Sequence, residues 1–261
     1  MAKATLTKRL EFCSSHRYDN PDWDNAKNRQ VFGACNNANT HGHNYLLEVT
    51  LCGEIDPVTG MIINLYDLKQ HLWDILIEFD HKNLNLDTPY FTDRIPTTEN
   101  LALTLWSLLK KHPQLPDLDR IRLYEDATLY SEISKELAQS SAPIDTARIG
   151  RRYQFAAVHQ SEQGSPQGHQ YELWVSLKGP VPPDTGQIIN LQTLDQIVTH
   201  EILQRWEQHN ISHDPLFSHF PVTDTSLAQQ CWALLKPLLS TPPLDHISIS
   251  QQSETSATFS E

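Results

Sequence analysis

The chain of 261 residues carries a formal net charge of −12, and 39% of its residues are hydrophobic. Such an acidic chain repels phosphate backbones and anionic lipids, which argues against nucleic acid or a membrane as a partner. No apolar run approaches the ~20 residues of a membrane span, and no signal-peptide stretch is evident, so we expect a cytoplasmic protein. Its four cysteines are too few and too unevenly placed for a disulfide framework.

Two strands with a long connection are predicted at the start of the chain. Residues 4–16 have apolar side chains at even positions, and residues 41–53 alternate in the same way from Tyr45 onward. Residues 17–40 are rich in Asn, Asp and Pro and predict a loop. Loops of this length inside a compact domain usually have a function.

Three histidines are expected to meet where these strands end. His41 and His43 are two strand residues apart and therefore face the same side. His16 joins them if the first strand pairs antiparallel with the second. Three neutral imidazoles leave the fourth tetrahedral position open, as in a catalytic zinc site. An isolated His-x-His is more often a chance pair, but His16, the nearby Cys35 and the downstream Asp80-His81 pair favour a metal site.

Two helices and two further strands complete the first half. Asn64 is a candidate N-cap for a helix that ends near Phe79 and is followed by Asp80 and His81 on a loop. A second helix is predicted to begin at 97–100 and to end at 110–113, before strands over 120–125 and 128–133. The predicted order is strand, strand, helix, helix, strand, strand.

The second half of the chain repeats the first. Residues 137–146 have the composition of a linker, and the matching segments beyond it recur at one constant interval: 43–45 with 169–171, 60–65 with 186–191, and Trp106 with Trp232. This pattern indicates an internal duplication.

The second copy lacks residues that a site would need. Gln167 stands for His41, Gln251 stands for Glu125, and nothing replaces Cys35. Asp80-His81 falls on Trp206-Glu207 without a gap, or on Glu207-Gln208 with a shift of one residue. By residue type, the second copy keeps the scaffold and has lost the site.

The first half closely resembles the 6-pyruvoyl-tetrahydropterin synthase family over nearly its whole length, in residues 32–45, 53–61, 80–84 and 97–100. The resemblance implies an α+β tunnelling fold, in which units of four antiparallel strands and two helices close β-barrels by oligomerisation. It also implies a catalytic unit over 1–136, a linker over 137–146 and a degenerate, non-catalytic second unit over 147–261.

Activity and residue roles are carried over from this resemblance. The family's enzymes are zinc-dependent lyases that convert 7,8-dihydroneopterin triphosphate to 6-pyruvoyl-tetrahydropterin and release triphosphate. The implied roles are zinc binding by His16, His41 and His43, proton abstraction by a Cys35 thiolate that Asp80 and His81 activate, and pterin anchoring by Glu125 with Thr97 and Thr98 lining the pocket.

Other interpretations remain open at this stage. Cys35 could be a passive loop thiol, Asp80-His81 could cap a helix, and Glu125 could belong to a tight turn. Among enzymes, 6-carboxytetrahydropterin synthase of the queuosine pathway shares the fold, zinc and substrate; the five residues between Cys35 and His41 favour the pyruvoyl type. A non-catalytic pterin-binding or scaffold protein is the third alternative, and it would not need Cys35 as a base.

Assembly follows from the unpaired edges of each four-stranded unit, which neighbours must cover until a barrel closes. In the pyruvoyl family three units form a ring and two rings stack. If each chain contributes one unit to each ring, three chains build the whole, so we expect a homotrimer. A dimer would instead indicate a four-unit ring in which first and second copies alternate.

Overall fold

The computed structural model describes residues 2–139, 145–160, 164–251 and 255–260. The chain divides into two compact units. Unit 1 comprises Met1–Ile149 and Pro180–Ile188, and unit 2 comprises Gly150–Gly179 and Ile189–Glu261. Pro180–Ile188 is part of the second repeat in sequence, but its contacts place it in unit 1.

The sheet of unit 1 confirms the predicted strands. Strand β1 (Lys3–His16) pairs antiparallel with β2 (His41–Glu54) over its whole length. Strand β4 (Asp117–Asp126) pairs with β2, and β5 (Leu129–Ser134) pairs with β4. A short strand, β3 (Lys82–Asn83), runs parallel to β1 along its outer edge. The strand order within unit 1 is β3-β1-β2-β4-β5.

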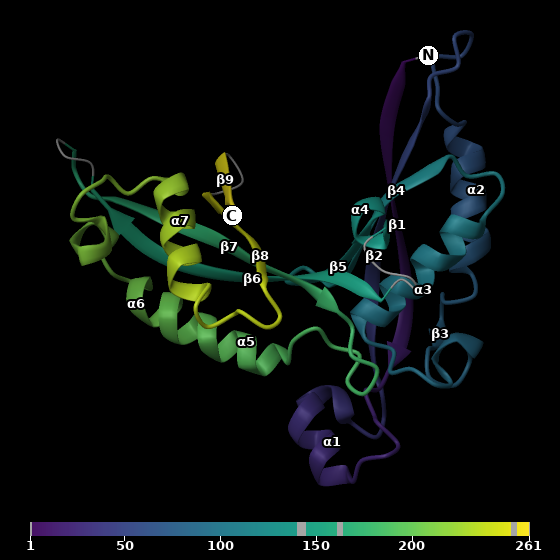
Figure 1. Cartoon of the computed structure of the whole chain (residues 1–261), viewed down its shortest axis with the longest axis horizontal. Helices are drawn as coiled ribbons and strands as arrows, with labels where there is room; N and C mark the ends of the chain where they lie inside the picture. The colour runs from purple at the N-terminus through teal and green to yellow at the C-terminus, as the bar shows by residue number, and fades with distance from the viewer. Residues whose placement is uncertain (1, 140–144, 161–163, 252–254, 261) are drawn as a thin grey trace. The chain divides into compact units, whose positions relative to one another are not determined.

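Helices α2 (Leu65–Leu76) and α3 (Thr98–Lys111) lie together on one face of this sheet (Figure 1). Asn64 caps α2 by accepting the N–H groups of Tyr66 and Asp67, and Thr97 caps α3 by accepting that of Asn100. Helix α2 ends at Leu76, three residues before the predicted end at Phe79. The core between helices and sheet is apolar and fully buried, as at Leu47, Leu51, Leu68, Leu72, Leu101 and Leu105.

The loop predicted over 17–40 was wrong for residues 25–36. They form α1 (Asn25–Phe32) and the 3-10 helix η1 (Gly33–Asn36). The Asp24 side chain caps α1 by accepting the Lys27 N–H, and Phe32 is buried against Tyr18 and Ile95. Because α1 is rich in Asn, Lys and Arg, it lacks the apolar period that would have predicted a helix. Two further short helices occur in unit 1, η2 (Pro89–Phe91) and α4 (Lys135–Gln139).

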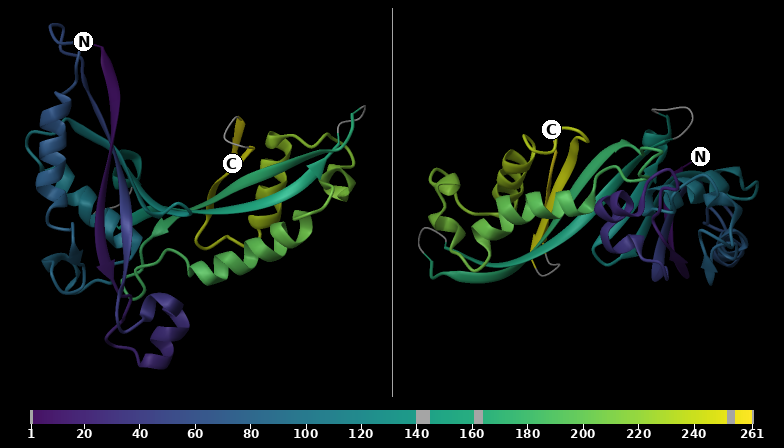
Figure 2. Two further views of the ribbon diagram at one scale, coloured as in Figure 1. Left: turned by 180° about the vertical axis from the view of Figure 1, so that it is seen from behind. Right: turned by 90° about the horizontal axis from the view of Figure 1, so that it is seen from below.

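Unit 2 repeats the same order of strands and helices. Its long strands are β6 (Thr146–His159) and β7 (Gln167–Pro180), and β7 pairs antiparallel with β8 (Leu244–Gln251), which pairs with β9 (Thr255–Phe259). Helices α5 (Leu191–Val198) and α7 (Asp224–Leu235) lie alongside β6 and β7 (Figure 2). Shorter helices lie between them: η3 (Thr199–Leu203), α6 (Gln204–Trp206), η4 (Ile211–His213) and η5 (Pro215–Phe217).

The region expected as a linker, 137–146, is described only at its ends. Residues 140–144 lie outside the described part of the chain. On either side of them, residues 137–139 are the last residues of α4, and Thr146 is the first residue of β6. All four cysteines are free. Within the described residues, no helix combines the length and apolar character needed to cross a bilayer.

Candidate functional site

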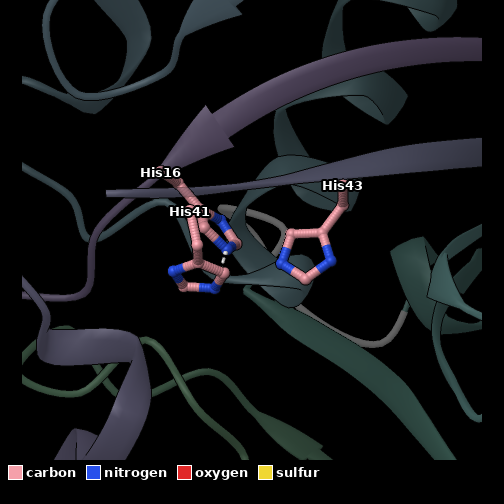
Figure 3. A group of neighbouring side chains, drawn as sticks. All are labelled: His16, His41 and His43. Carbon is pink, nitrogen blue, oxygen red and sulfur yellow. Dashed lines mark hydrogen bonds between the residues drawn. The ribbon is translucent and has the colours of Figure 1, made fainter. Parts of the chain in front are cut away.

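The three histidines meet at the end of the β1–β2 ladder, where His16 is the direct partner of His41. All three rings hang on the same side of the two strands (Figure 3). Ring centroids are 4.6 Å apart for His16 and His41 and 4.9 Å apart for the two pairs with His43. One nitrogen from each ring lies within 4.8 Å of the others. The structure therefore brings the three predicted histidines together.

Burial favours the neutral form of the His16 and His41 imidazoles by lowering the pKa of each. The pKa of His16 is lowered to about 3, first by burial and then by His41 and His43. Burial and the neighbouring His43 also lower the pKa of His41. His16 Nδ1 lies 2.9 Å from the Pro96 carbonyl oxygen, to which it can donate, so Nε2 keeps its lone pair and faces His41.

The donor set fits a zinc ion. Three imidazole nitrogens at this spacing would leave one tetrahedral position open on such an ion. His43 Nε2 is buried and has no hydrogen-bond partner among the described residues. A buried polar atom without a partner is costly, and a metal ion would satisfy it.

Glu125 lies beside this triad, at the end of β4. Its Oε1 is 3.6 Å from His43 Nε2, while Oε2 accepts hydrogen bonds from the Tyr18 hydroxyl at 3.2 Å and from the Thr98 hydroxyl. Burial raises the pKa of the Glu125 carboxyl. The carboxylate predicted on an apolar strand face is thus buried, as expected from its parity with Ile121 and Leu123. Tyr18 is a site residue that the sequence did not indicate.

Cys35 belongs to η1, on the segment that connects β1 to β2. It packs against the buried cluster of Tyr18, Phe32 and Ile95, and its carbonyl oxygen accepts the Tyr18 N–H at 2.9 Å. The pKa of the Cys35 thiol is raised to about 11, first by burial and then by Glu125. At neutral pH the thiol is therefore protonated and needs a proton acceptor to react as a base.

Asp80 and His81 form a pair at the outer edge of β1, just before β3. Asp80 Oδ2 is 2.7 Å from His81 Nδ1, and Asp80 Oδ1 accepts the Cys13 N–H at 2.9 Å. The His81 side chain is 79% exposed. Within the described residues, no hydrogen bond or ion pair joins either residue to Cys35. The structure thus brings Asp80 and His81 together, but it does not bring them to the thiol of the same chain.

Thr97 and Thr98 differ in what their hydroxyls contact. Thr98 donates to Glu125, whereas Thr97 donates to the Gly186 carbonyl oxygen at 2.6 Å. The next residue of α3, Glu99, is buried, and its carboxylate accepts the Ile188 N–H at 3.1 Å. Burial raises the Glu99 pKa to about 7. The motif at 97–100 contained Glu99, but nothing in the sequence showed which of its side chains are buried.

The second repeat keeps only part of this arrangement. Glu207 accepts the Ala156 N–H as Asp80 accepts that of Cys13, and Gln208 has a positive φ of 59° where His81 has 56°. The structure thereby selects the Glu207-Gln208 alignment. His159 and His169 remain, with parallel rings 4.8 Å apart, but Gln167 and Gln251 replace the third histidine and the carboxylate.

Fold and site together define a tandem α+β protein with a three-histidine centre in its first copy. The model of the 6-pyruvoyl tetrahydropterin synthase family matches residues 5–136 and again 148–261. The chain therefore belongs to the 6-pyruvoyl tetrahydropterin synthase family, as a tandem duplication with the tunnelling fold of that family.

Individual proteins are similar to part of this chain. The 6-pyruvoyl tetrahydrobiopterin synthase of Homo sapiens is 44% identical over 124 residues, which are 47% of this chain and 86% of that protein. The structure of Caenorhabditis elegans 6-pyruvoyl tetrahydropterin synthase is 33% identical and covers 51% of this chain and 96% of its own, with a TM-score of 0.49. A putative 6-carboxy-5,6,7,8-tetrahydropterin synthase of Archaeoglobus fulgidus is 32% identical over 95 residues, 36% of this chain and 76% of that protein. The chain is an enzyme of this synthase family.

Proposed function

We propose that this chain is a zinc-dependent lyase that converts 7,8-dihydroneopterin triphosphate to 6-pyruvoyl tetrahydropterin and releases triphosphate. The observation that carries the proposal is the 3.6 Å approach of the Glu125 carboxylate to the His43 imidazole. A carboxylate matches the 2-amino and ring N–H groups of a pterin, which are two donors on one edge. A ring anchored at Glu125 would hold its side chain near the metal-binding histidines.

Each site residue has a distinct task in this proposal. His16, His41 and His43 would hold the zinc, which would supply a Lewis acid for the hydroxyls of the substrate's side chain and so make the adjacent protons easier to remove. Cys35 is the base that takes such a proton. Because burial raises its pKa to about 11, the Cys35 thiol must first pass its own proton to an acceptor. His81, oriented by Asp80, is the acceptor that we propose.

The position of Asp80 and His81 implies a site shared between chains. The pair lies at the sheet edge beyond β1 with His81 exposed, and it has no contact with Cys35 of its own chain among the described residues. We therefore propose that the pair serves Cys35 of a neighbouring copy. Mixing Cys35→Ala and His81→Ala proteins after partial unfolding should restore part of the activity, because some sites then receive both intact residues. If mixtures stay inactive, the pair has another role.

The assembly that this requires is a homo-oligomer, and the count of units per chain leads us to propose a homotrimer. Light scattering should then give about three times the chain mass of 29.8 kDa. A dimer would instead indicate a ring of four units in which first and second copies alternate. A stable monomer would refute both.

The decisive assay is product analysis after incubation with dihydroneopterin triphosphate and zinc. The proposal requires 6-pyruvoyl tetrahydropterin and free triphosphate, and neither should appear with Cys35→Ala. A 6-carboxytetrahydropterin product would assign the chain to the queuosine-type reaction instead. Pterin binding without turnover would identify a non-catalytic binding protein.

A further inference from the structure

A segment of the second repeat lies against the first repeat's site. Residues 184–188 follow β7, yet they belong to unit 1. The Gly186 carbonyl oxygen accepts the Thr97 hydroxyl at 2.6 Å, the Ile188 N–H donates to Glu99 Oε1 at 3.1 Å, and the Asp184 carbonyl oxygen accepts the Asn20 side-chain amide at 2.8 Å. The first two bonds are buried, so both are costly to lose.

The same turn occurs in the first repeat, where it is free. Gly60 has a φ of 70° and Gly186 one of 68°, and their N–H groups bond to Asp56 O and Pro182 O in the same way. A Cβ at Gly60 would meet no atom within 4 Å. A Cβ at Gly186 would lie 2.7 Å from Asn100 Nδ2. The two repeats thus have the same backbone turn, but only the turn at Gly186 packs against other residues.

Residues 184–188 contact the N-terminal end of α3, and the same end of α3 also contacts Glu125. Thr97 is the N-cap of α3, and Thr98, the next residue, donates its hydroxyl to Glu125. Glu99 is held by the Ile188 N–H on the adjoining side. Since a helix turn is rigid, bonds to Thr97 and Glu99 fix the direction in which the Thr98 hydroxyl points.

We propose that residues 184–188 of the second repeat are a positioning element of the first repeat's pterin pocket, acting through Thr97 and Glu99 to hold Thr98 on Glu125. The second repeat has lost its own site residues, but its residues 184–188 support the site of the first repeat. The inference rests on the proposed function, because it takes the ring of a pterin as the ligand at Glu125.

Two glycine substitutions in the full-length chain form a matched pair for the test. Gly186→Ala and Gly60→Ala impose the same left-handed strain, but only the former pushes against Asn100 and Thr97. The probe is neopterin, a pterin without phosphates, titrated by fluorescence. Gly186→Ala should weaken neopterin binding by at least about tenfold, the loss expected for one hydrogen bond to a charged group, with zinc content unchanged. Gly60→Ala should bind as the unaltered protein does.

A second variant covers the case in which Gly186→Ala fails to fold. Asn20→Asp keeps the size and the oxygen that accepts the Asp22 N–H, but it replaces the amide donor to Asp184 O. It should weaken neopterin binding by about threefold at unchanged zinc content. Equal neopterin affinity in Gly186→Ala, or in Asn20→Asp where Gly186→Ala does not fold, would overturn the inference alone. If the unaltered protein bound no neopterin, the proposed function would fall first.

Discussion

His43 Nε2 and Glu125 Oε1 lie 3.6 Å apart, although the two residues are on different strands and far apart in the chain. The antiparallel register of β2 and β4, in which Leu46 is opposite Tyr124, brings His43 and Glu125 to the same end of the sheet. Each has a second anchor in the site: His43 packs against the other two imidazoles, and Glu125 accepts the Tyr18 and Thr98 hydroxyls. A metal ion held by the histidines and a carboxylate that binds the pterin ring would therefore lie side by side in the site.

Zinc content should be about one ion per chain and should depend on the triad. His41→Ala removes one of three ligands, so elemental analysis after dialysis should show that most of the zinc is lost. His71, Asp74 and His112 form another group with ligand atoms within 4.8 Å of one another, which makes His71→Ala the matched control. Two zinc ions per chain that persist in His41→Ala would contradict the assignment of the triad.

Replacement of the proposed base should separate catalysis from metal binding. Cys35→Ala should abolish triphosphate release, by at least about a hundredfold, because it removes the group that abstracts the proton. Zinc should remain bound, since Cys35 packs on Tyr18 and Phe32 rather than joining the three histidines. Loss of zinc in this variant would make Cys35 a fourth ligand and the centre a structural one.

Removal of the Glu125 charge should weaken binding of the pterin ring and leave the zinc content unchanged. Glu125→Gln has the size of the native side chain and copies Gln251 of the second repeat. Its amide N–H₂ would face the donors of the pterin edge, so KM should rise by about tenfold to a hundredfold, as expected for a lost charge-assisted hydrogen bond of about 1.5–3 kcal/mol. The measurement is a steady-state titration with zinc analysis alongside. An unchanged KM would show that the ring binds elsewhere.

The stability of the metal-free protein should fall in acid because of His16. Burial lowers the folded-state pKa of His16 to about 3, against an ordinary pKa of 6.5 for a histidine side chain. Between these pH values the unfolded chain binds a proton that the folded chain does not, so stability is present above pH 6.5 and is lost as the pH falls toward 3. Thermal unfolding of chelator-treated protein should show this decline, and His16→Gln should flatten it. An equally steep decline in His16→Gln would assign the acid sensitivity to other groups.

The sequence alone predicted the repeat and the strands, because both depend on local spacing, and it proposed three histidines as metal ligands. Alternation along 4–16 and 41–53 fixed which side chains share a strand face, and the capping residues Asn64 and Thr97 marked the helix starts that the structure confirms. The sequence missed α1, a polar helix whose stability comes from the burial of Phe32 and from the Asp24 cap.

Only the tertiary structure decided which of the predicted residues meet within one chain. The approach of Glu125 to His43, the burial of Glu99, and the separation of Asp80 and His81 from Cys35 depend on strand pairing and loop paths between segments that are distant in sequence. The docking of residues 184–188 on α3 shows this most clearly. Gly60 and Gly186 belong to nearly identical turns, yet one is exposed and the other is buried. A local sequence encodes the shape of a turn, whereas its burial depends on which surface the rest of the chain places against it.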